Sequence, residues 1–175
     1  MANLSPRPGL LGHRLAAHLL RRASFAVSKD RINAFAGMTA TEAVETLLAI
    51  PSLVHPEGPI NWMDGTTPWL TTGPYDNGPN TFMGRKRRAV WLWVVNEMLH
   101  DPSVRHKMAL FWHSIFVTEE DRDWSEFDLF RLFQMFATGN VKTLAYKVTL
   151  DNKMLRYLNN NNNRRDSPNE NYARE

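Results

Sequence analysis

Apolar residues recur at three- and four-residue spacing along most of this chain, and this spacing constrains the fold more than any other feature. It places apolar side chains on one face of a helix. The ranges that follow it are 10–22, 85–99, 106–116, 124–138 and 141–148. We find no convincing alternation of apolar and polar residues, the pattern typical of a half-buried strand. The sequence therefore predicts an all-α fold, a multi-helix array or bundle.

Capping signals predict where several helices begin. Thr39 precedes Glu42 by three residues, which is the spacing of a capping box. The Asp101–Pro102 pair has the composition of a helix start, with the cap followed by a first-turn proline. Side chains that can accept a hydrogen bond from the first helical turn precede three more helices, at Ser28, Asn140 and Asp151.

Residues 51–84 differ from the rest of the chain. Six prolines and five glycines fall in this range, which excludes a long helix or a central strand. Aromatic residues occur between them, and they favour an ordered loop packed on the helices over a free linker. The sequence thus predicts one domain-like unit over 1–175, with a long loop at 51–84 and a helical core at 85–158.

The last part of the chain combines an asparagine run with a helix-start signal. Residues 159–167 are predicted to form an Asn-rich loop, because asparagine prefers turns and left-handed backbone. Ser167, Pro168 and Glu170 then supply a cap, a first-turn proline and a capping-box glutamate. A helix is therefore expected over 168–175. Only about two turns would fit, so we expect the chain to be the N-terminal part of a larger helical domain.

Composition narrows the functional classes. The chain has 175 residues, a formal net charge of +3 and no cysteine, so disulfides and thiolate metal sites are excluded. No apolar run approaches the ~20 residues of a membrane span, and no clean signal peptide is visible at the N-terminus. Much of the positive charge lies in one cluster, Arg85–Arg88, which could bind phosphate but is too narrow to favour nucleic-acid binding.

Four blocks of sequence resemble the N-terminal part of the DUF1800 family, which comprises bacterial proteins of unknown function. The blocks are AAHLLRRASFA, HKMALFWHSIFVT, ATGNVKTLAYKVTLDNKMLRYLNN and NRRDSPNENYARE, in the order of the family. SPNENYARE is the most specific of them, and the ASFAVSKDRINAF stretch is most similar to members from the Bacteroidota. The resemblance implies a longer helical protein. It also implies export, a sulfatase-like partner protein and no established catalytic residues to carry over.

The Asn-rich segment and the residues after it are the best candidate for a binding site. Asparagine side chains offer donors and an acceptor, which suits a polar ligand such as a sugar, or a hard cation. The alternative is a structural loop whose hydrogen bonds are satisfied internally. Glu170 and Glu175 are weak candidates for an acid or base, and the candidate ligand-binding residues are Asn161, Asn163, Arg164, Asn169, Asn171 and Tyr172.

Two further groups invite a functional interpretation. His18, Arg21 and Arg22 form a basic face that could bind an anion, or could pair with acidic residues such as Glu170 or Glu175. His106 and His113 share a helix face, but seven residues separate them by about 10 Å along the axis, too far to chelate one metal ion. We expect His113 to flank the core beside Trp112 and to form a hydrogen bond with a backbone or side-chain partner.

These observations leave two functional hypotheses. The first is a non-catalytic binding or assembly protein of the cell envelope, because no catalytic constellation appears in the sequence. The second is a hydrolase-like enzyme whose active site is completed by downstream sequence, with the Asn-rich segment as one wall. The residues identify no cofactor and no metal.

Overall fold

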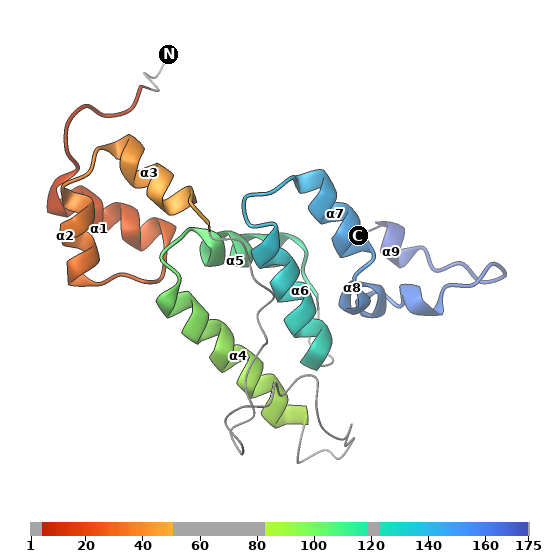
Figure 1. Cartoon of the computed structure of the whole chain (residues 1–175). Helices are drawn as coiled ribbons and strands as arrows, with labels where there is room; N and C mark the ends of the chain where they lie inside the picture. The colour runs from red at the N-terminus through yellow and green to blue at the C-terminus, as the bar shows by residue number, and fades with distance from the viewer. Residues whose placement is uncertain (1–4, 51–82, 119–122, 175) are drawn as a thin grey trace.

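The computed structural model describes residues 5–50, 83–118 and 123–174 (Figure 1). These residues form helices and turns and contain no strand, so the predicted all-α class is confirmed. The elements in chain order are α1 (Gly12–Ala23), α2 (Lys29–Ala36), α3 (Ala40–Leu48), α4 (Met83–His100), α5 (Arg105–Ile115), α6 (Asp123–Met135), α7 (Val141–Thr149), α8 (Asn152–Tyr157), the short 3-10 helix η1 (Asn160–Asn162) and α9 (Asn171–Arg174). Most of the predicted loop at 51–84 lies outside the described residues.

The buried side chains form two apolar clusters. The first joins α1, α2 and α3 around Leu20, Phe35 and Leu47. The second joins the helices from α4 to α8 around Phe130 and Phe133, which are 2% and 0% exposed. In Figure 1, α1 to α3 lie at one end of the molecule and α7 to α9 at the other, with α4, α5 and α6 between them.

A short junction connects the two clusters. The amide of Val104 donates a hydrogen bond to the carbonyl of Leu47 over 3.1 Å, and the guanidinium of Arg31 donates to the carbonyl of Pro102. Val104 also packs against the α1–α3 cluster. The residues just before α5 therefore hold the N-terminal helices against the rest of the chain.

Most predicted caps are confirmed. Ser28 accepts from the amide of Arg31, and Thr39 and Glu42 form the reciprocal capping box. Asn140 and Asp151 accept from the first turns of α7 and α8. These contacts satisfy amides that the first helical turn leaves without a partner.

Two predicted helix starts are wrong by three residues. The helix expected at Pro102 begins at Arg105, because Asp101 accepts from both the amide and the hydroxyl of Ser103 and forms a turn first. The helix expected at Pro168 begins at Asn171. There the amide of Ser167 donates to the carbonyl of Arg164, and Asn169 accepts from the amide of Asn171 as the capping side chain.

Candidate functional site

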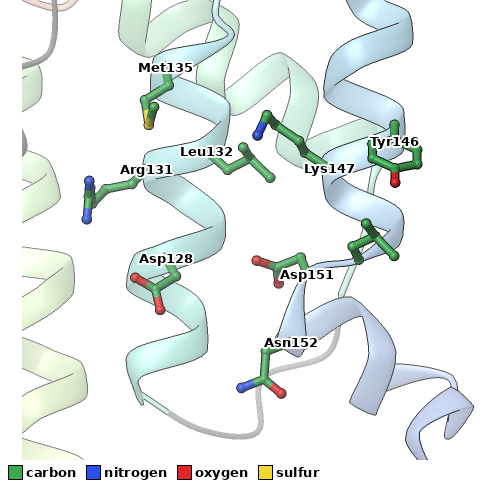
Figure 2. Close-up of a pocket in the computed structure, with 9 residues that line it drawn as sticks. Asp128, Arg131, Leu132, Met135, Tyr146, Lys147, Asp151 and Asn152 are labelled. Atoms are coloured by element: carbon green, nitrogen blue, oxygen red, sulfur yellow. The ribbon is translucent and has the colours of Figure 1, made fainter.

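A groove of about 450 Å³ lies between α6, α7 and α8 (Figure 2). The two turns that join these helices create it. Gly139 and Asn140 reverse the chain after α6, and Leu150 and Asp151 reverse it after α7. The lining combines an apolar floor with charged side chains, and comprises Asp128, Arg131, Leu132, Met135, Tyr146, Lys147, Leu150, Asp151 and Asn152.

Asp151 holds one edge of this groove. Its carboxylate caps α8 by accepting from the amide of Lys153 over 2.8 Å, and Figure 2 shows the side chain pointing toward α6. Burial raises the pKa of Asp151, the backbone hydrogen bonds from Lys153 and Met154 oppose this effect, and the negative charge of Asp128 adds to it. The carboxylates of Asp128 and Asp151 therefore repel each other across the groove, and this repulsion contributes to the raised pKa of Asp151.

Arg131 is the most unusual residue of the lining. The whole residue is 8% exposed, its guanidinium lies 5.4 Å from the ring centre of Phe127, and its Nε has no hydrogen-bond partner. Burial lowers the pKa of Arg131 and the charge of Asp128 opposes this, but an arginine stays protonated in proteins. A buried donor without an acceptor is costly. Figure 2 shows the side chain of Arg131 on the side of α6 away from Lys147 and Asp151, so it lines the edge of the groove.

The other walls of the groove are charged or amphipathic. Lys147, on α7, points toward α6, and Tyr146 precedes it on the same helix. Leu132, Met135 and Leu150 supply apolar surface between the charged groups. The groove can therefore hold a small solute that has both charged and apolar parts.

A buried ion pair joins two of the helices that form the groove. Lys153 on α8 and Glu126 on α6 are 2% and 4% exposed, and their charged groups are in direct contact. His113 on α5 approaches the same carboxylate, with 3.7 Å between Nε2 and Oε1. Burial lowers the pKa of His113, and Lys153 lowers it further. The expected polar partner of His113 is Glu126, at a distance typical of an ion pair and longer than a hydrogen bond. The cluster joins three helices.

His106 belongs to a second buried polar group and does not join His113. Its Nδ1 lies 3.4 Å from Nε2 of Gln134, and its Nε2 lies 3.6 Å from Oδ2 of Asp101. Burial lowers the pKa of His106 to about 4. The negative charge of Asp101 opposes this shift, and the positive charge of Arg105 adds to it. Among the described residues, no group of three potential ligands is placed to hold a metal ion.

The Asn-rich segment forms a hydrogen-bonded loop of its own. Asn159 adopts left-handed backbone with a φ of 57°, and the amide side chain of Asn163 donates to that of Asn160. Asn163 accepts from the amide of Asn169, whose own side chain donates to the carbonyl of Leu158 over 2.9 Å. The candidate residues Asn163 and Asn169 therefore form hydrogen bonds within the loop itself.

The remaining candidates in this segment lie at or near its surface. Asn161 and Arg164 are exposed, Asn171 accepts from Arg174, and Glu175 lies outside the described residues. The hydroxyl of Tyr172 donates to the carbonyl of Thr149 over 2.6 Å; burial raises the pKa of this phenol and the hydrogen bond opposes that effect. Tyr172 also lines a second, mainly apolar pocket of about 370 Å³ between α5, α7 and α8.

The basic faces lie elsewhere in the molecule. His18, Arg21 and Arg22 are exposed on α1. Figure 1 shows α1 at the opposite end of the molecule from α9, which begins directly after Glu170, so the structure does not bring these groups together. Glu170 lies 3.8 Å from Arg174 within its own segment. The backbone of Arg85–Arg88 belongs to the start of α4.

The groove and the buried Glu126–Lys153 pair escaped prediction from the sequence. Both depend on contacts between residues that are far apart along the chain. For the groove, the sequence offered one signal, the predicted cap Asp151. A cap predicts where a helix begins, but it does not predict which neighbouring helix the carboxylate faces. Helical spacing on α6 places Arg131 three residues after Asp128 without indicating that it is buried.

In the part of the chain that the structure describes, no helix is long and apolar enough to cross a membrane. Comparison with known proteins found no match among curated proteins and none among solved structures. A family model described as protein of unknown function (DUF1800) matches residues 18–175. This match covers most of the chain and includes α2 to α9 with the groove, so the chain belongs to the DUF1800 family.

Proposed function

We propose that the chain is a non-catalytic binding protein whose ligand occupies the groove between α6, α7 and α8. The observation that carries this proposal is the groove itself, a space of about 450 Å³ whose lining includes the cations Arg131 and Lys147. Arginine and lysine side chains form charge-assisted hydrogen bonds with anionic groups. The size of the groove suits a small molecule.

The test is a ligand screen that is read as a thermal shift of the full chain, with small carboxylates and inorganic phosphate as probes. A ligand at about 100 times its Kd should stabilise the protein by ~2.7 kcal/mol. Arg131→Met should remove this shift. Arg22→Met is the matched variant on the basic face of α1, and it should leave the shift unchanged. If Arg22→Met removes the shift and Arg131→Met does not, the site is on α1 and the proposal is wrong.

We extend the proposal to an assembly role in the cell envelope, with a sulfatase-like protein as the partner. The support for this step is the resemblance of the four sequence blocks to exported family members. Fractionation of cells of the source organism, followed by co-purification through a tagged copy at its native locus, tests it. Recovery of the protein in the cytoplasm without such a partner would refute the extension but not the ligand site.

A hydrolase-like enzyme that uses the Asn-rich segment as one wall remains the second candidate. It is favoured by Glu170, whose side chain is 85% exposed and therefore open to a substrate. Glu170→Gln tests it cleanly, because it changes only an exposed side chain. Loss of hydrolysis by the full-length protein with an unchanged melting temperature would support the enzyme. Unchanged hydrolysis would exclude Glu170 as acid or base.

A further inference from the structure

Helix α1 presents an outer face that consists of basic side chains. The residues of this α1 basic face are all exposed and comprise Arg14, His18, Arg21 and Arg22. A helix turns by about 100° per residue, so these four positions fall within an arc of about 100°, and no other residue of α1 lies in that arc. The side of α1 that packs on the α1–α3 cluster, around the fully buried Leu20, lies opposite this arc.

Neither helix stability nor ion pairing within the described residues accounts for this face. Arg21 and Arg22 lie in the last turn of α1, where positive charge interacts favourably with the helix dipole. Arg14 lies in the first turn, where positive charge opposes the dipole, and that turn has no acidic residue. In the part of the chain that the structure describes, none of the three arginines forms an ion pair. Their charges are therefore available to an anionic partner.

The net charge of the chain is concentrated at the same end of the molecule. Residues 1–50, which include α1 to α3, contain six lysines and arginines and three acidic residues, a formal net charge of +3. This equals the charge of the whole chain, so residues 51–175 are neutral in total. In Figure 1, α1 to α3 lie at one end and α7 to α9 at the other. A negatively charged surface should therefore attract the α1 end and orient the molecule toward it.

The composition of the α1 basic face indicates the kind of partner. A stable protein–protein interface has an apolar centre with charges at its rim, and this face has no apolar side chain within its arc. A nucleic acid is read by side chains that contact base edges or stack on bases, and the face has neither amides nor large aromatic rings. An anionic lipid surface needs neither feature, because each arginine near it adds its own electrostatic attraction.

An exposed leucine next to α1 also favours a lipid surface. Leu10 precedes the helix and is 62% exposed. The amide of Leu11 donates to the carbonyl of Met38 over 2.9 Å, so the backbone beside Leu10 is anchored to the fold. A leucine side chain gains free energy in the interface of a bilayer, whereas it gains none from the phosphates of a nucleic acid.

We propose that the α1 basic face docks the protein on an anionic lipid surface, with Arg14, Arg21 and Arg22 against the phosphate headgroups. About 12 Å along the helix axis separates Arg14 from Arg22, so the arginines can meet different headgroups. The docking surface lies at the other end of the molecule from the groove, and it does not depend on the ligand proposed there. The small anions that test the groove engage only part of this face and should bind it weakly.

The experiment is co-sedimentation of the full chain with phosphatidylcholine vesicles that either contain or lack phosphatidylglycerol. Binding should require the anionic lipid and should be lost when salt rises from about 0.1 M to about 1 M, because screening then shortens the range of the attraction from about 10 Å to about 3 Å. Arg22→Gln should weaken binding about five-fold. The triple variant Arg14→Gln/Arg21→Gln/Arg22→Gln should weaken it on the order of 100-fold.

The matched control removes three exposed cations near the other end of the molecule, in the triple variant Lys142→Gln/Arg164→Gln/Arg165→Gln. The two triple variants have the same net charge. The control should nevertheless bind the anionic vesicles at least about ten times more tightly than the α1 variant. All six replaced side chains are exposed, so both variants should keep the melting temperature of the parent protein.

Four results would overturn the inference. An equal loss of binding in the two triple variants would mean that net charge alone drives the attraction. Equal binding to vesicles with and without phosphatidylglycerol would exclude the anionic headgroup as the partner, and absence of binding to either would exclude docking on lipid. A short DNA duplex is the last probe. If the duplex binds through the three arginines and the vesicles do not bind, the partner of the face is a nucleic acid.

Discussion

Acid should destabilise this protein through His106, and the structure allows the size of the effect to be worked out. The ring is buried between Asp101 and Gln134, and its pKa falls from the ordinary value of 6.5 to about 4 in the folded state. Each pKa unit corresponds to ~1.4 kcal/mol. The full effect is therefore about 3 kcal/mol, a large part of the 5–15 kcal/mol that stabilises a typical domain.

The direction of the effect follows from where the proton binds. Between pH 6.5 and 4 the unfolded chain binds a proton at His106 and the folded chain does not, so acid favours the unfolded state. The contribution of this residue is fully present above pH 6.5 and is lost as pH falls toward 4. At pH 4.5 the loss should be about 2.5 kcal/mol relative to pH 7.5.

The assay is urea unfolding at pH 7.5 and 4.5, for the parent protein and for His106→Gln. The free energy of unfolding of the parent should fall between the two pH values by about 2.5 kcal/mol more than that of the variant. Other titrating groups, Asp151 among them, are common to both proteins and cancel in this difference. His13→Gln, which removes an exposed imidazole of α1, controls for the loss of one histidine.

Two results would refute the reasoning. The first is an equal pH dependence of the parent and His106→Gln. The second is an NMR titration that places the pKa of His106 near 6.5 in the folded protein. Either one would mean that water or a rearranged Gln134 side chain solvates the charged ring as well as bulk solvent does.

The other predictions concern stability. Glu126→Gln leaves Lys153 buried opposite a neutral side chain and should cost about 3–5 kcal/mol in urea unfolding, whereas replacing both residues by leucine should recover much of that loss. Asn169→Ala removes the side-chain hydrogen bonds to Leu158 and Asn171 and should speed amide exchange across the C-terminal segment, whereas exposed Asn161→Ala should not. Phe133→Ala empties a fully buried site and should cost about 3–5 kcal/mol, and a loss below about 1 kcal/mol would mean that the α4–α8 cluster is not packed around this ring.

The local part of the fold was readable from the sequence. The Thr39–Glu42 capping box and the Asn140 cap need only a side chain and an amide two or three residues away, so residue type and spacing determine them. The same reasoning failed at Asp101 and Ser167. In both places a neighbouring polar side chain offered the backbone a competing turn, and composition alone does not show which arrangement has the lower free energy.

Only the tertiary structure determines which residues of α6, α7 and α8 come together in the groove. Helical spacing places Arg131 and Asp128 on one surface of α6, but only the packing of whole helices buries Arg131 and brings Asp151 toward α6. The contact between Glu126 and Lys153 likewise depends on how two helices pack. A single sequence specifies which residues face the core, because that follows from helical periodicity. It does not show which buried charges meet, because that depends on the positions of whole helices.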